Sequence, residues 1–200
     1  MPVETHEDKE KGLRLRIETD EMPTDPRGWD NLGTLIIWHS KYVMGDENPY
    51  KTPEDFYAEI NDDNAIILPV YMYDHSGVAL STSCTYPFND VWDAGQAGYI
   101  YVTKDKVRKE YNVKRISQQL RQKVIGILNE EIRTYNQYLA GDIYGYVIEQ
   151  KSTCPHCGHV EWETLDSCWG FYGRNPDRNG MKDSVSKDYK YLFDLPETEE

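Results

Sequence analysis

The chain has 200 residues and a formal net charge of −13, with 38% hydrophobic residues and 16 Tyr, 5 Trp and 4 Phe. The aromatic residues exclude a disordered chain, and the length predicts one domain. No apolar run reaches the roughly 20 residues that span a bilayer, and the acidic residues 1–10 lack the features of a signal peptide, so we expect a cytoplasmic protein with no membrane contact.

The order of the predicted elements indicates the fold class. Period-two alternation or short apolar runs predict strands at 13–17, 34–39, 65–73, 78–83, 99–102, 143–150 and 167–172. Pro69 interrupts the third of these, which indicates an edge strand or a bulge.

Helices are predicted between the strands. Thr52-Pro53-Glu54-Asp55 is typical of a helix start, with a cap, a proline in the first turn and two acids. A short helix is expected at 104–111. A long amphipathic helix is expected at 117–139, where apolar residues recur every three or four positions.

Together these elements predict an α+β fold, with a mostly antiparallel sheet covered on one face by the long helix and a small cysteine-bearing hairpin insertion. We expect a flexible acidic tail at 1–10, a single domain at 11–173 with the inserted hairpin at 151–166, and a polar C-terminal tail at 174–200.

The run Cys154-Pro155-His156-Cys157-Gly158-His159 is the most specific local motif. A Cys-x-x-Cys turn ending in glycine resembles one half of a zinc ribbon, and a reducing compartment favours metal over a disulfide. Four ligands are needed for structural zinc, and the candidate set is Cys154, Cys157, His159 and Cys168. The alternative is an exposed hairpin tip without metal.

A second candidate site combines a His-containing turn with aromatic residues. A small hydrolase or a ligand-binding protein could use Asp74, His75, Trp92, Asp93 and Trp169. A backbone-bonding turn and an aromatic core strand explain the same residues. No motif here establishes an enzyme, and no catalytic residue is assigned.

Charge is distributed unevenly along the chain. Residues 1–63 hold 16 acidic and 7 basic side chains, whereas residues 104–133 hold 9 basic and 4 acidic ones. An acidic surface could imitate the phosphates of nucleic acid, and its candidate residues are Glu54, Asp55, Glu59, Asp62 and Asp63. Eight of these nine basic residues could contact phosphates or form a solvated helix face; they are Lys104, Lys106, Arg108, Lys109, Lys114, Arg115, Arg121 and Lys123.

The stretches YDHSG, WDAGQAGYIYVTK and DSCWGFYG resemble a family of small acidic proteins of bacteriophages and other mobile elements. The resemblance covers roughly residues 31–173 and implies no catalytic residues. It implies a non-enzymatic accessory protein that binds and modulates a host protein of defence or nucleic-acid processing. With this net charge, direct nucleic-acid binding is not expected.

Overall fold

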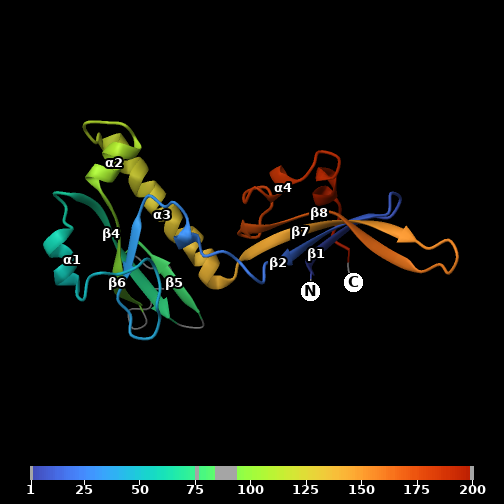
Figure 1. Cartoon of the computed structure of the whole chain (residues 1–200), viewed down its shortest axis with the longest axis horizontal. Coiled ribbons are helices and arrows are strands. Elements are labelled where there is room, and N and C mark those ends of the chain that lie inside the picture. Colours follow the sequence, from blue (N-terminus) through green and yellow to red (C-terminus); the bar gives the residue numbers. More distant parts are fainter. Residues whose placement is uncertain (1, 75–76, 84–93, 199–200) are drawn as a thin grey trace. The chain divides into compact units, whose positions relative to one another are not determined.

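The computed structural model describes residues 2–74, 77–83 and 94–198. The chain divides into two compact units, where the sequence predicted one domain. We call residues 1–24 and 141–200 the terminal unit and residues 25–140 the inserted unit. Each unit has its own four-stranded antiparallel sheet and its own core, so the predicted α+β class is confirmed (Figure 1).

The sheet of the terminal unit has the order β1-β2-β7-β8, and every neighbouring pair is antiparallel. Its strands are β1 (Pro2–Asp8), β2 (Leu13–Thr19), β7 (Ile143–Thr153) and β8 (Val160–Tyr172). Along β2 the predicted alternation holds, because Leu13, Leu15 and Ile17 are buried on one face. On the other face Glu149 receives hydrogen bonds from Arg14 and Arg16, which hold its pKa below the ordinary value although burial opposes this.

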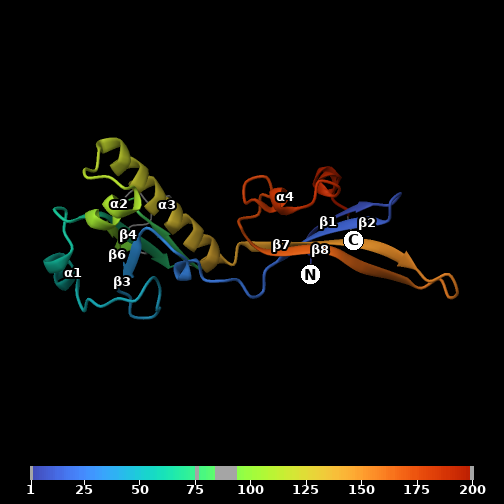
Figure 2. The same ribbon diagram turned by 45° about the horizontal axis from the view of Figure 1, so that its top comes forward.

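Both ends of the chain belong to this unit, contrary to the predicted tails. Strand β1 pairs with β2 along most of its length, and the Nδ1 atom of buried His6 lies 2.8 Å from the carbonyl oxygen of Leu195. The C-terminal segment forms the short helix α4 (Met181–Ser184) and the 3-10 helix η2 (Lys190–Asp194). Figure 2 shows this segment lying over the sheet. Its residues Met181, Val185 and Leu192 belong to the core of the unit.

The sheet of the inserted unit has the order β3-β6-β4-β5. The strands are β3 (Thr34–Ile37), β4 (Ala65–Asp74), β5 (Val78–Ser81) and β6 (Ala94–Thr103). The helical elements are η1 (Pro26–Gly28), α1 (Pro53–Glu59), α2 (Lys104–Glu110) and α3 (Gln118–Ala140). Pro69 pairs with Tyr99 of β6, whereas the described pairing of β5 covers Tyr71–Asp74, so at Pro69 strand β4 is paired on one side, as at an edge. A register shift between Val70 and Tyr71 follows directly, so neither predicted alternative is excluded.

Helix α3 covers one face of this sheet, as predicted. Its buried residues are Val124, Leu128, Ile132 and Tyr135. They share one core cluster with buried residues of the strands, among them Ile100 of β6. The side chain of Asn136 exchanges two hydrogen bonds with the backbone of Leu80, which satisfies part of the outer edge of β5. The opposite face carries an aromatic cluster around Phe56, and helix α1 packs there.

Candidate functional site

The five acidic residues of the predicted interaction surface all lie on α1 and the turn that follows it. Thr52 and Asp55 form a reciprocal capping box at the start of α1, which confirms the predicted helix start. After the helix, the amide of Asp63 donates to the side chain of Asn61. The exposed carboxylates are those of Glu54, Asp55, Glu59, Asp62 and Asp63.

The aromatic cluster around Phe56 packs this acidic segment against the sheet. Phe56 is fully buried and stacks on Tyr99, with ring centroids 5.1 Å apart. Tyr57 is 46% exposed among the acids, and burial together with neighbouring Tyr99 and Asp62 raises its pKa to about 12. Burial and the hydroxyl of Tyr101 likewise raise the pKa of Tyr50 to about 12. These tyrosines are therefore neutral at physiological pH, and the charge of the segment comes from its carboxylates.

The charge of the acidic segment is not neutralised within the described residues, where none of its five carboxylates forms an ion pair with Lys, Arg or His. Lys104 comes close, but its Nζ donates to the backbone carbonyls of Asp62 and Asp63, at 2.7 and 3.0 Å. That contact fixes the turn and leaves its carboxylates facing solvent.

The cysteine motif forms the tip of the β7–β8 hairpin, which extends past the end of β2 (Figure 1). The amide of Cys154 donates to the carbonyl of His159 at 2.8 Å, and the amide of Gly158, at a φ of +70°, donates to the carbonyl of Cys154. The amides of Cys157 and His156 and the side chain of Cys157 lower the pKa of the Cys154 thiol. The tip therefore brings two thiols together and favours the thiolate that a metal binds.

The other two predicted zinc ligands are placed differently. Cys168 pairs with Tyr146 in the sheet, eight positions along β8 from Val160, or about 26 Å at the usual strand rise. The Nε2 atom of His159 lies 3.4 Å from the carboxylate of Glu161. Across the described ranges, no three His, Cys, Asp or Glu side chains gather as a metal site. The structure thus separates Cys168 from the other three residues of the predicted set.

The residues proposed for the hydrolase alternative are divided between the units. Asp74 ends β4, where it accepts a hydrogen bond from the hydroxyl of Tyr42 and lies 3.7 Å from Lys41 Nζ. Trp169 belongs to β8 in the terminal unit, where its ring leaves no room for a Cβ at Gly145. His75, Trp92 and Asp93 lie outside the described residues.

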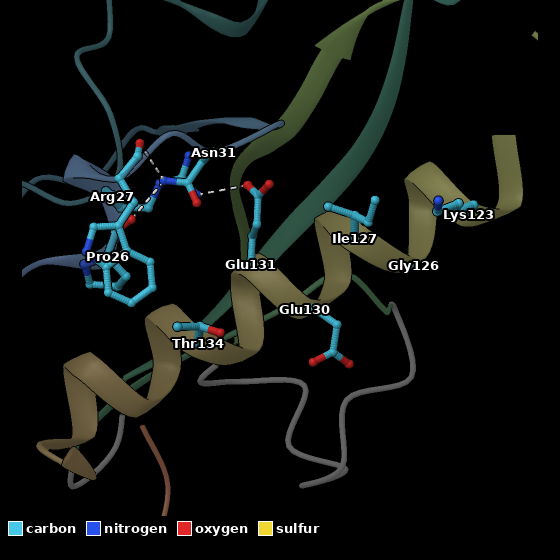
Figure 3. Close-up of a pocket in the computed structure, with 10 residues that line it drawn as sticks. Pro26, Arg27, Asn31, Lys123, Gly126, Ile127, Glu130, Glu131 and Thr134 are labelled. Carbon is cyan, nitrogen blue, oxygen red and sulfur yellow. Dashed lines mark hydrogen bonds and ion pairs between the residues drawn. The ribbon is translucent and has the colours of Figure 1, made fainter. Parts of the chain in front are cut away.

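A buried ion network beside a pocket of about 470 Å³ was not predicted from the sequence (Figure 3). The guanidinium of Arg27, only 4% exposed, contacts Asp46 at 2.6 Å and Glu131 at 3.1 Å. Although burial opposes it, the hydrogen bonds and charges of these carboxylates raise the pKa of Arg27. Figure 3 shows Glu131 directed toward Arg27 and Glu130 directed away from it. The signal was present in the sequence, because Glu131 lies three residues after Leu128, on the apolar face of α3.

Comparison of the chain with protein-family models, curated proteins and solved structures found no match. In the part of the chain that the structure describes, no helix is both long enough and apolar enough to cross a membrane.

Proposed function

We propose that this chain is a non-enzymatic accessory protein of a phage or mobile element, and that it binds a basic surface of a host protein through the acidic segment of α1 and its following turn. The observation that carries the proposal is the group of five exposed carboxylates without an ion-pair partner among the described residues. The resemblance to phage and mobile-element proteins supports the context of a host defence or nucleic-acid-processing partner.

The chemistry of the segment suits protein recognition. Unpaired carboxylates attract a basic partner over distances of about 8–10 Å at physiological ionic strength and raise the rate of encounter. The exposed Tyr57 ring among them is of the residue type that most often contributes binding energy at interface centres. A partner that normally holds nucleic acid would meet carboxylates in place of phosphates, and the protein would then act as a nucleic-acid mimic.

The test is capture of a partner by the tagged chain from lysate of the host cell, with purification and measurement of that partner's affinity. The variant reverses Glu54, Asp62 and Asp63 to Lys and leaves Asp55 intact, because Asp55 caps α1. We expect affinity to fall by at least about tenfold, since each reversal replaces an attraction by a repulsion at the interface. Affinity of the wild type should also fall as salt is raised.

The matched control reverses three exposed acids of the terminal unit, Glu10, Glu163 and Asp188, and changes the net charge equally. It should retain the affinity of the wild type. Equal losses of affinity in the two variants would show that overall net charge, and not the acidic segment, determines binding. Affinity that changes neither with reversal of Glu54, Asp62 and Asp63 nor with salt would contradict the proposal.

We also propose that the hairpin tip binds zinc for a structural purpose, through Cys154, Cys157 and His159. Support comes from the two free thiols of Cys154 and Cys157, which lie close together in one turn, and from the lowered pKa of Cys154. His159 would have to turn from Glu161 toward the thiols, and a closed tetrahedral site needs one more ligand than these three residues supply.

A further inference from the structure

A second pocket in the inserted unit has a strongly basic lining. Its volume is about 440 Å³, and it lies where α2, the α2–α3 connection and the start of α3 meet the beginning of β4. Five of its lining side chains are cations, contributed by Lys104, Arg108, Lys114, Arg115 and Arg121. No carboxylate is among the described residues that line it.

Three of these cations have no carboxylate partner in the described part of the chain. Arg108 pairs with Asp105, which lies outside the pocket lining, and Lys104 donates to two backbone carbonyls. Lys114, Arg115 and Arg121 form no ion pair with any described residue. Positive charge therefore remains uncompensated in the pocket, although the chain as a whole is strongly acidic.

The start of α3 adds to this positive potential. Ser117 caps the helix, because its hydroxyl accepts the amide of Leu120 at 3.2 Å and its carbonyl accepts the amide of Arg121 at 2.9 Å. The first turn contains no acidic residue, and Ser117, Gln118 and Arg121 all line the pocket. Cations beside the positive end of a 23-residue helix lower its stability. Such an unfavourable arrangement is expected where a ligand supplies the missing negative charge.

We infer that this pocket binds the phosphate groups of a small phosphorylated molecule carrying two or three linked phosphates. Its volume lies within the usual range for small-molecule sites, about 300–1,000 Å³. Several cations around a helix start suit a compact ligand with several negative charges. A long nucleic acid fits less well, because the remainder of this acidic chain would repel its backbone.

Isothermal titration of the full chain with inorganic triphosphate at physiological salt tests the inference, and ATP as a second probe distinguishes a free phosphate chain from a nucleotide. We expect binding of one molecule per chain. The Arg115→Ala, Arg121→Ala double variant should lose at least about tenfold in affinity, because it removes two charge-assisted contacts. The control Arg133→Ala removes an exposed cation of the same helix that pairs with Glu130, and it should bind as the wild type does.

A second variant separates loss of binding from loss of folding. Arg121→Glu should abolish triphosphate binding and raise the thermal midpoint of the ligand-free protein by about 1–3 °C, because it places an acid in the first turns of α3. Lys114→Gln, at an exposed loop position, serves if the double variant fails to fold. Absence of triphosphate and ATP binding, equal losses with Arg133→Ala, or tighter binding of duplex DNA than of either probe would overturn the inference.

Discussion

Glu131 lies on the buried side of α3, and its carboxylate holds three groups of the chain segment before β3. It accepts the amides of Leu32 and Gly33 and the guanidinium of Arg27, and only 10% of its side chain is exposed. Arg27 in turn bonds Asp46, which accepts the amide of Leu35. This network therefore ties η1, the start of β3 and the loop after β3 to the long helix.

Substitution of Glu131 by Gln should destabilise the inserted unit by about 1–3 kcal/mol, because it removes one of the two carboxylates of the buried Arg27 and leaves Asp46 as the other. Glu130→Gln is the matched control on the same helix. Its pair with Arg133 is exposed, so the loss should stay below about 1 kcal/mol. Urea unfolding followed by circular dichroism measures both; similar losses in the two variants would show that the buried network contributes no more than a surface pair.

At the residue scale, the sequence predicted which side chains are exposed or share a local turn better than it predicted which distant side chains lie close together. The acids of the α1 segment are exposed as expected, and Cys154 and Cys157 share one turn because four residues of chain keep them together. Cys168 was assigned to the same site on its sequence spacing, but it lies eight positions along β8 from Val160 and therefore away from the tip. The ion pair between Arg27 and Asp46 was not predicted, because a contact between residues of two separate loops leaves no periodic pattern in the sequence.

Whole elements were predictable wherever a local pattern was strong. The long helix was expected at 117–139 and spans Gln118–Ala140, because its apolar spacing is sustained over six turns. By contrast, β1 was read as a tail because its sequence, PVETHED, has few apolar residues, and its stability comes from pairing with β2. The isolated apolar residues of the C-terminal segment are buried by tertiary contacts that no periodicity reveals.

The β7–β8 tip gives a prediction at the scale of this element. Purified wild-type protein should contain zinc, and the Cys154→Ser, Cys157→Ser variant should lose it, because two thiolates supply most of the metal affinity. The circular dichroism spectrum and the cooperativity of unfolding should persist, because neither core contains a residue of the tip. Elemental analysis of each purified protein provides the measurement.

Cys168→Ser is the control for the zinc prediction. Cys168 lies in the sheet opposite Tyr146, so this variant should keep its zinc. Loss of zinc from the Cys168→Ser variant would show that Cys168 is a ligand after all. Absence of zinc from the wild type would contradict the metal site and identify the tip as an exposed turn without metal.

On the scale of the whole molecule, the inserted unit interrupts a pair of neighbouring strands. Thr19 at the end of β2 pairs with Tyr144 of β7, and the amide of Asp20 donates to the carbonyl of Ile143. The hydroxyl of Tyr172 bonds the carbonyl of Thr24 close to the point where the chain leaves the terminal unit. A single domain was expected because 200 residues fit the usual length of one domain, and a non-local strand pairing cannot be read from local patterns.

Excision of residues 25–140, with Thr24 joined to Gly141, should leave a terminal unit that still folds. The deletion converts β2 and β7 into a hairpin with a short loop, while the sheet and the C-terminal segment keep their contacts. Two-dimensional NMR of the shortened chain should show dispersed amide signals. Leu15→Asp in the same chain is the control and should abolish that dispersion, because Leu15 is fully buried. A collapsed spectrum for the parent deletion would show that the terminal unit depends on the inserted one.

The same interrupted strand pair imposes an order on folding during synthesis. At roughly 5–20 residues per second, β2 leaves the ribosome about 6–25 s before its partner β7. The inserted unit is complete by then and can fold in that interval, since all its strands and helices lie between Asp25 and Ala140. Once folded, it replaces a long flexible loop by a rigid body, which lowers the entropy lost when β7 reaches β2. A newly made chain should therefore close its terminal sheet faster than a chain diluted from denaturant, in which both units start unfolded.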